Sequence, residues 1–316
     1  MKNKIKIGLA LGSGSARGLA HVGVLKVLEE AGIKIDFIAG ASIGAMIGVA
    51  YALYGKVSPL LDAVYEIQKK PVNFMIDPAF PIKGIVSGKK IEAYLDDFGF
   101  KNKEFRDLKI PAIVVATDVF GWRRVALIQG SITKAVRASI SVPGIFSPVK
   151  YGNTYLVDGG VTDPVPVDLL YESGVDFVIA VGLFPSSDVY TVWNLRDDDN
   201  LPKVEDVKEN KAFYELLIQI GKDKMISGIN WLKNGVEGPN VLSVLFTSIN
   251  IMQKELSIRS LKMADIAIVP PDLRGGLLDF DKAPEFIEKG EKAARKMLPL
   301  IEKKLKEKEK SALLVT

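Results

Sequence analysis

The chain has 316 residues, of which 48% are hydrophobic and 25% charged, a balance that excludes a disordered chain and allows one large α/β domain or two small ones. It has no cysteine, which excludes a disulfide framework, a thiol nucleophile and a thiolate metal site, and which suits a reducing cytoplasm. One histidine excludes any multi-histidine metal site, and a net charge of +4 is too weak to indicate a nucleic-acid partner.

Two apolar segments resemble targeting signals without being well suited to that role. The first, at 5–11, follows a basic start, but Gly8 and Gly12 interrupt it and Arg17 follows, so a buried strand entering a glycine loop is favoured over a signal peptide. The second, at 37–55, is uncharged and long enough to span a bilayer. Its small residues and internal turn motif favour a strand, a tight turn and a buried helix over a membrane span.

In chain order, the hydrophobic pattern predicts strands that alternate with helices. Strands are expected at 5–11, 34–39, 110–117, 122–128, 154–157 and 176–183. Helices are expected at 18–30, 43–54, 58–69, 88–98, 131–138, between the last two strands, and at 283–307. Such alternation predicts an α/β fold with a mostly parallel sheet and helices on both faces.

We expect a single domain over 1–300, with its motifs within 5–185 and a charged helix end and tail over 301–316. The section 185–240 differs in character, because a charged, turn-prone run at 196–200 precedes an amphipathic stretch. Two interpretations stay open for that stretch: a helix facing the core, or a cap that presents apolar surface to lipid.

The first motif is Gly40-Ala41-Ser42-Ile43-Gly44, a G-x-S-x-G sequence between an expected strand and an expected buried helix. This is the setting that a nucleophile elbow requires, because the flanking glycines allow a tight turn that exposes the serine oxygen. The helix that follows directs its N-terminal amides toward the same point. The motif therefore predicts that Ser42 is a nucleophile, against the alternative of a simple packing turn.

The second motif is the small-residue loop 12–18, which carries Arg17 and follows the first strand. It lacks the third glycine of a dinucleotide loop and the Gly-Lys of a P-loop. Exposed amides at a helix N-terminus, with one cation beside them, bind an anion. If Ser42 attacks an ester, that anion is the tetrahedral oxyanion; a strand-to-helix packing turn is the alternative.

The third motif is Asp158-Gly159-Gly160, after an expected strand. The motif alone is weak, since Asp-Gly is also a common turn signal. Asp118, at the end of another expected strand, is a rival acid by position.

The histidine count restricts the mechanism. The hydrolase order of serine, acid and then histidine is impossible, because no histidine follows Ser42. His21 lies beside the anion loop and is expected to be structural rather than a base. A carboxylate must then accept the serine proton directly, and burial in an apolar cleft raises its pKa toward neutrality.

Taken together, these motifs, with His21-Val22-Gly23-Val24-Leu25 and the segment 138–149, resemble the patatin-like phospholipase family, in its prokaryotic branch. The resemblance implies a serine acyl-hydrolase on a three-layer α/β/α fold, with a Ser–Asp dyad and neither metal nor cofactor. It implies that Ser42 is the nucleophile and Asp158 the base, with Gly40, Gly44, Gly159 and Gly160 completing their motifs. It further implies an oxyanion hole at Gly12, Gly14, Ser15 and Ala16, helped by Arg17.

One departure from the family pattern concerns the loop. Many members have three consecutive glycines where this chain has Ser13-Gly14-Ser15, although a Gly-Ser-Gly form also resembles the prokaryotic branch. Serine suits these positions only if the backbone avoids strained dihedral angles.

The expected function is therefore a lipid acyl-hydrolase of the phospholipase, lysophospholipase or esterase type. Its partner is an acyl lipid, and transient contact with an anionic membrane surface suits the weak positive charge. Two other classes stay open: a regulatory or scaffolding protein that hydrolyses little, and a nucleotide-binding protein.

Overall fold

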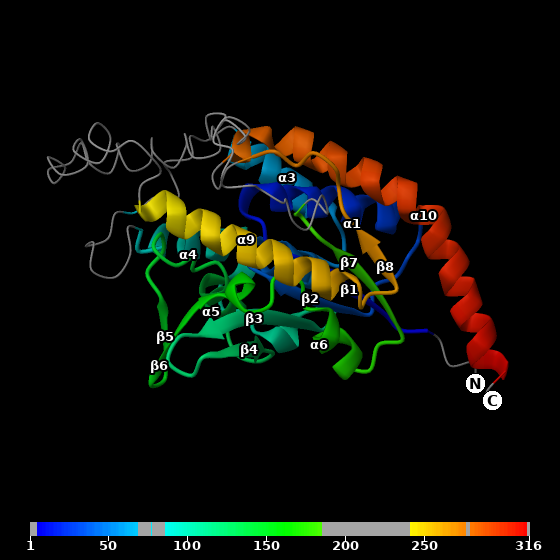
Figure 1. The fold of residues 1–316 in the computed structure, drawn as a ribbon, viewed down its shortest axis with the longest axis horizontal. Helices are drawn as coiled ribbons and strands as arrows, with labels where there is room; N and C mark the ends of the chain where they lie inside the picture. The colour runs from blue at the N-terminus through cyan, green and yellow to red at the C-terminus, as the bar shows by residue number, and fades with distance from the viewer. Residues whose placement is uncertain (1–4, 69–76, 78–85, 185–240, 276–278, 315–316) are drawn as a thin grey trace, which may run out of the picture.

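The structure is a computed structural model that describes residues 5–68, 77, 86–184, 241–275 and 279–314; the section 185–240, interpreted above as a cap or a core-facing helix, lies outside them. The described residues form one eight-stranded sheet covered by helices on both faces (Figure 1). The strands are β1 (Ile7–Leu11), β2 (Phe37–Ala41), β3 (Ala112–Asp118), β4 (Arg123–Leu127), β5 (Val149–Tyr151), β6 (Thr154–Asp158), β7 (Phe177–Val181) and β8 (Ile266–Ile268). The helices are α1 (Ala20–Glu30), α2 (Ile43–Tyr54), α3 (Ser58–Gln68), α4 (Lys89–Leu95), α5 (Ile132–Ser139), α6 (Val167–Glu172), α9 (Val241–Leu261) and α10 (Ala283–Leu314).

The sheet has the order β5-β6-β3-β2-β1-β7-β8, with β4 also paired to β3. Its centre, from β3 through β2, β1 and β7 to β8, is parallel, whereas β4, β5 and β6 join by antiparallel pairing. The predicted α/β fold with a mostly parallel sheet is therefore confirmed.

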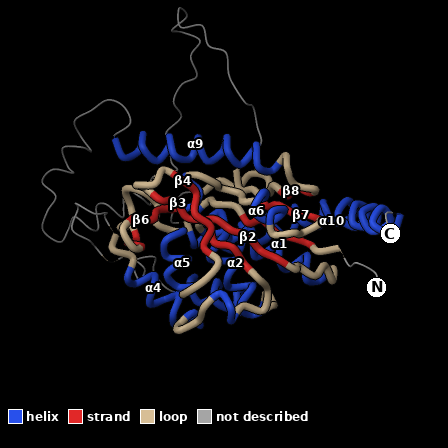
Figure 2. Tube along the Cα trace, turned by 90° about the horizontal axis from the view of Figure 1, so that it is seen from below, coloured by secondary structure: helices blue, strands red, loops and turns tan. Residues whose placement is uncertain are grey.

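Alternating side chains of the central strand serve two separate cores. Leu9 and Leu11 of β1 pack into the core that α1, α2 and α10 cover, while Ala10 points to the opposite face, which α6 covers. Figure 2 shows the same division, with α2 and α5 on one side of the sheet and α6 and α9 on the other. Each fully buried leucine contributes about 1.5–3 kcal/mol to this arrangement.

One edge of β3 is shared by two strands that run toward each other. Residues 114–118 of β3 pair with β4, so β4 occupies the whole of the other edge there. On the shared edge, β2 runs parallel to β3 and ends opposite Val115, whereas β6 runs antiparallel and ends opposite Ala116. The residues that follow β2 and those that end β6 are therefore brought together above the middle of the sheet.

The last helix is longer than expected, since α10 continues past residue 307 to Leu314. Its end is rich in lysine and glutamate, which favour helix, and Lys303 and Glu307 approach to 4.0 Å one turn apart. Within the described residues, none of the helices has the length and apolar character needed to cross a bilayer.

Candidate active site

Ser42 lies in a strained turn between β2 and α2. Its φ of 54° and ψ of −125° are unusual for a residue with a side chain, and such strain costs on the order of 1–3 kcal/mol. The turn is close-packed, because a Cβ on Gly44 would lie 2.1 Å from the carbonyl oxygen of Leu11 and one on Gly40 would lie 2.6 Å from Gly44. The predicted turn between a strand and a buried helix is therefore present, and it requires the glycines of the motif.

Asp158, the last residue of β6, accepts a hydrogen bond from the hydroxyl of Ser42. Ser42 Oγ donates to Asp158 Oδ2 at 2.6 Å, and the Gly160 amide donates to Asp158 Oδ1 at 2.7 Å. Gly159 allows this turn to press against β3, since a Cβ there would lie 2.1 Å from the Val115 carbonyl oxygen. The structure thus brings the two predicted residues into direct contact.

The environment of Asp158 changes its acidity. The side chain is almost completely buried, and burial raises its pKa to about 7, against the opposing effect of the hydrogen bonds from Ser42 and Gly160. A carboxylate with a pKa near neutrality can accept a proton from a hydroxyl more readily than one with the ordinary value.

Asp118, the rival acid, has a different place. Its carboxylate accepts hydrogen bonds from Thr154, from the backbone amides of Phe120 and Gly121, and from Arg123 Nε. These bonds, with that from Thr154 first, lower its pKa. Asp118 therefore fixes the turn between β3 and β4, and its partners within the described chain do not include Ser42.

The glycine loop, residues 12–18, has only some of its backbone amides free to bind a ligand. The Gly12 amide donates to Val181 O at 3.0 Å, which continues the pairing of β1 with β7, and the Ser13 amide donates to Pro164 O at 2.8 Å in the segment before α6. Gly12 thus offers no free amide, which differs from the expectation. Gly14 and Ser15 line the cavity above Ser42, and their amides have no hydrogen-bond partner among the described residues.

Two further features of the loop bear on its expected role. Ser15 has a φ of 54°, so the condition that serine suits this loop only without strained dihedral angles is not met at this position, whereas Ser13 is not among the residues with a positive φ. Arg17 donates from Nε to the Gly14 carbonyl at 3.2 Å, and its guanidinium lies 4.7 Å from the ring centre of Phe184. Arg17 therefore braces the loop and also lines the cavity, whereas Ala16 is buried beneath it and is not part of the lining.

His21 supports the loop from inside. Its Nε2 lies 2.8 Å from the Gly12 carbonyl oxygen, which can only accept, so Nε2 carries the proton. Burial lowers the pKa of His21 to about 4, and Nδ1 is buried without a partner within the described residues. A neutral histidine bound to a carbonyl oxygen is structural, as expected, and no contact places it on Ser42.

A cavity of about 250 Å³ opens above the Ser42–Asp158 pair. Its wall opposite the glycine loop is α9, which the sequence analysis did not assign to the site. Apolar and polar residues of α9 both face it, namely Phe246, Thr247, Ile249, Asn250, Ile251, Gln253 and Lys254. The available signal for this wall was weak: Asn250, Gln253 and Lys254 recur at helical spacing, but polar residues are spread along the whole of α9.

Sequence reasoning also missed Ser139, at the end of α5. Its Oγ accepts the Ser42 amide at 2.8 Å and donates to the Val115 carbonyl oxygen at 2.6 Å. Ser139 lies in the segment 138–149, which suggested the family resemblance without assigning a role to any of its residues. Among the described residues, no group of three or more His, Cys, Asp or Glu is arranged to hold a metal ion.

Comparison with known proteins gives consistent matches over the region of these motifs. The family model described as patatin-like phospholipase matches residues 9–171. An NTE family protein of Mycobacterium tuberculosis is 36% identical over 179 residues, which cover 56% of this chain and 49% of that protein. The chain therefore spans about half the length of this relative.

Two eukaryotic relatives match a longer part of the chain. Neuropathy target esterase sws of Drosophila melanogaster is 29% identical over 240 residues, covering 69% of this chain and 17% of that protein. Lysophospholipase nte1 of Aspergillus fumigatus is 28% identical over 256 residues, covering 75% of this chain and 17% of that protein.

Proposed function

The chain belongs to the patatin-like phospholipase family, and from this premise we propose that it is a serine acyl-hydrolase that cleaves carboxylic esters of lipids. The observation that carries the proposal is the 2.6 Å hydrogen bond from Ser42 Oγ to the buried carboxylate of Asp158. The names of the relatives, an esterase and a lysophospholipase, support the same class of reaction.

In the first half of the reaction, Ser42 Oγ attacks the ester carbonyl carbon while Asp158 Oδ2 accepts the hydroxyl proton. The raised pKa of Asp158, about 7, suits this transfer near neutral pH. Asp158 then returns the proton to the leaving alcohol, and the acyl group stays on Ser42. In the second half, Asp158 takes a proton from water, whose oxygen attacks the acyl carbon. The bond from the acyl carbon to Ser42 Oγ then breaks, Asp158 returns the proton to Ser42 Oγ, and the fatty acid is released.

The negative charge that develops on the carbonyl oxygen needs donors that are already in place. The amides of Gly14 and Ser15 are the candidates, since they line the cavity beside Ser42 and have no partner within the described residues. The Ser42 amide itself donates to Ser139 and is not available. Loss of one such donor typically reduces the rate about 10²- to 10³-fold.

The lining of the cavity supports a substrate with an acyl chain and a polar end. Val142, Phe184, Phe246, Ile249 and Ile251 supply apolar surface next to Ser42. Apolar surface also excludes water when an acyl chain is bound, which keeps Asp158 a stronger base than it would be in water.

A fluorophosphonate probe tests the proposal, because it reacts with activated serines. We expect the folded protein to be labelled at Ser42, mapped by peptide mass spectrometry, and not at Ser13 or Ser15, which line the same cavity. Ser42→Ala should not be labelled, whereas Ser15→Ala, the matched control, should be labelled at the wild-type rate. Folded wild-type protein that resists labelling would favour the scaffolding alternative.

The substrate class is tested on a panel of acyl lipids. Free fatty acid is measured from phosphatidylcholine, lysophosphatidylcholine, monoacylglycerol and acyl-coenzyme A, with Ser42→Ala as the blank in each case. Release from at least one of these by the wild type only is the expected result. Release at equal rates from both proteins would contradict the assignment of Ser42.

A further inference from the structure

Arg137, in the last turn of α5, is a cation buried in the protein interior. It is 2% exposed, and burial lowers its pKa. Within the described residues, two carboxylates act on its charge: Glu92, which is 44% exposed and lies 4.0 Å from Nε, and Asp77. Arg137 makes no closer ion pair with either, and a buried charge is costly unless its donors are satisfied, so its hydrogen bonds indicate why it is there.

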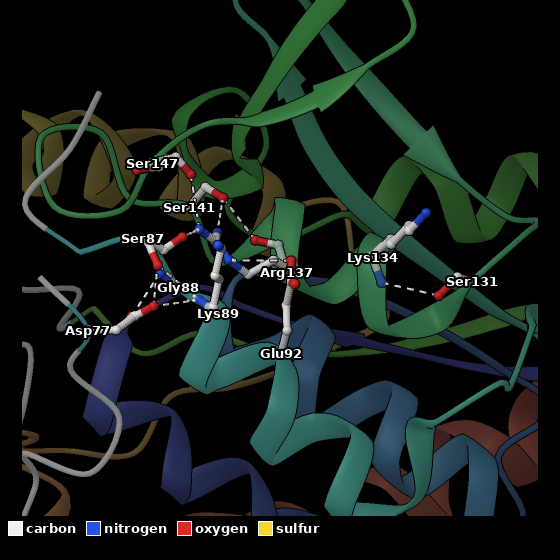
Figure 3. A network of polar contacts seen from close by, with 10 residues as sticks. All are labelled: Asp77, Ser87, Gly88, Lys89, Glu92, Ser131, Lys134, Arg137, Ser141 and Ser147. Carbon is white, nitrogen blue, oxygen red and sulfur yellow. Dashed lines mark hydrogen bonds and ion pairs between the residues drawn. The ribbon is translucent and has the colours of Figure 1, made fainter. Parts of the chain in front are cut away.

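The guanidinium of Arg137 holds three segments together (Figure 3). Nη1 donates to Ser141 Oγ at 2.5 Å, and Nη2 donates to the carbonyl oxygens of Ser87 at 2.7 Å and Ser147 at 3.0 Å. Ser87 is in turn held by the carboxylate of Asp77, which accepts a hydrogen bond from the Ser87 hydroxyl. The side chain is therefore fixed on all sides.

Ser141 connects this network to the base. Its hydroxyl returns a hydrogen bond to the Arg137 carbonyl oxygen at 2.8 Å, so the turn that follows α5 is closed on itself. The Ser141 carbonyl oxygen accepts the Asp158 amide at 2.9 Å. Arg137 thus acts on the backbone of Asp158 through one intermediate residue.

Ser139 connects the same turn to the nucleophile. Its Oγ accepts the amide of Ser42, whose backbone is strained, and donates to Val115 in β3. Val115 pairs with Ala41, the residue before Ser42, so Ser139 ties the elbow to the neighbouring strand. Ser139 is completely buried, and its two hydrogen bonds use both its acceptor and its donor.

We propose that the end of α5 sets the distance between the two reacting groups, with Ser139 as a positioning residue for Ser42 and Arg137 as a positioning residue for Asp158. The inference rests on the proposed function, because it concerns the same pair. Ser139 and Ser141 are two positions apart. Ser139 accepts the backbone amide of Ser42 with its hydroxyl, and Ser141 accepts the backbone amide of Asp158 with its carbonyl oxygen. Displacement of reacting groups by about 1 Å can reduce a rate about 100-fold.

The test compares Ser139→Ala and Arg137→Lys with Ser131→Ala. Ser131 is the matched control, because it caps the other end of α5 through the Lys134 amide and touches neither reacting group (Figure 3). Each protein is assayed well below its own unfolding temperature on the best ester of the panel. We expect kcat to fall about 10- to 100-fold in the first two variants with KM within about threefold, and Ser131→Ala to stay within about twofold.

A second readout separates positioning from loss of stability. The hydrogen bond from Ser42 lowers the pKa of Asp158, so a longer Ser42–Asp158 contact should move the acid limb of kcat/KM to higher pH in both variants. Ser131→Ala should leave the limb where it is in the wild type. A merely structural role for Ser139 and Arg137 would not move it.

The outcomes distinguish this inference from the proposed function. Wild type that neither hydrolyses esters nor reacts with the fluorophosphonate overturns both. Active wild type with Ser139→Ala and Arg137→Lys at wild-type kcat, or altered in KM alone, overturns the inference only. If Arg137→Lys does not fold, Ser141→Ala replaces it, because that variant removes the hydroxyl that Arg137 holds and keeps the cation.

Discussion

Ser42 donates a hydrogen bond to Asp158 across 2.6 Å, although 116 positions separate them in the sequence. The contact follows from the shared edge of β3, where β2 ends opposite Val115 and β6 ends opposite Ala116. Any change that shifts the register of either strand by one residue would turn its side chains to the other face of the sheet. The geometry of the pair is therefore as well defined as the sheet itself.

The first prediction concerns the pH dependence of hydrolysis. Asp158 must be ionised to accept the Ser42 proton, and burial raises its pKa to about 7. We expect kcat/KM to be constant above about pH 8 and to fall about tenfold for each pH unit below 7. A neutral acyl ester assayed from pH 5 to 9 checks this; a flat profile down to pH 5 would contradict it.

The second prediction concerns Asp158→Asn, which should reduce kcat about 10²- to 10⁴-fold by removing the base. The same variant should be more stable than the wild type at pH 8. The carboxyl group has a pKa of 3.8 as its ordinary value and about 7 when folded, so the folded protein binds the proton more tightly. Wild-type stability therefore falls as pH rises from about 4 through 7, and asparagine avoids this loss.

The gain in Asp158→Asn should be largest at pH 8, where a pKa of 3.8 raised to about 7 corresponds to about 4 kcal/mol, and should shrink toward pH 4. Thermal unfolding of both proteins across this range measures it. Asp118→Asn is the matched control with the opposite sign, because hydrogen bonds lower the pKa of Asp118 and its ionised form is stabilised by folding. Equal stability of Asp158→Asn and wild type at pH 8 would mean that the carboxylate is less buried than the structure indicates.

The elements near the site could be predicted largely because each motif acts locally. G-x-S-x-G specifies a turn through the glycines on either side of Ser42, and those close approaches are seen at Gly40 and Gly44. The choice between Asp118 and Asp158 could not be made from position, since both end strands. The choice depends on the pairing of β6 with β3, which brings Asp158 next to the end of β2 and so next to Ser42. Pairing between distant strands leaves no local signal in one sequence.

The supporting contacts were out of reach for a similar reason. Ser139 contacts Ser42 across 97 positions of the sequence. The helix α9 contacts the glycine loop through the hydrogen bond that Ser13 Oγ donates to Gln253 Oε1 at 3.3 Å. The strain at Ser15 was also missed, because a serine in a left-handed conformation is an exception that only the surrounding packing can impose.

The third prediction concerns His21, whose ordinary pKa of 6.5 is close enough to 7 to be mistaken for that of the base. His21→Gln keeps a side-chain N–H that can reach the Gly12 carbonyl oxygen. We expect kcat/KM within about tenfold of the wild type and an unchanged acid limb, measured on the same ester. Disappearance of the limb in this variant would assign the titration to the histidine.

His21 should instead affect acid stability. Because burial lowers its pKa to about 4, the unfolded chain binds the proton more tightly, and wild-type stability falls as pH drops from 6.5 toward 4. His21→Gln removes this dependence. The difference in unfolding temperature between the two proteins should therefore shift in favour of the variant as the pH is lowered, and a difference that is independent of pH would contradict the buried neutral state.

The last prediction concerns Ser15, whose φ of 54° places its Cβ in an unfavourable position. Ser15→Gly removes the Cβ and keeps the amide that faces the cavity. We expect the free energy of unfolding to rise by about 0.5–1 kcal/mol, measured by urea denaturation, because relief of strain exceeds the added freedom of the unfolded chain.

Ser15→Ala is the matched control: it removes the hydroxyl, keeps the Cβ and should give no gain. If both variants are equally stabilised, the hydroxyl rather than the backbone conformation is the source of the strain. Turnover should stay within about threefold of the wild type in both, because the proposed donor to the oxyanion is the amide.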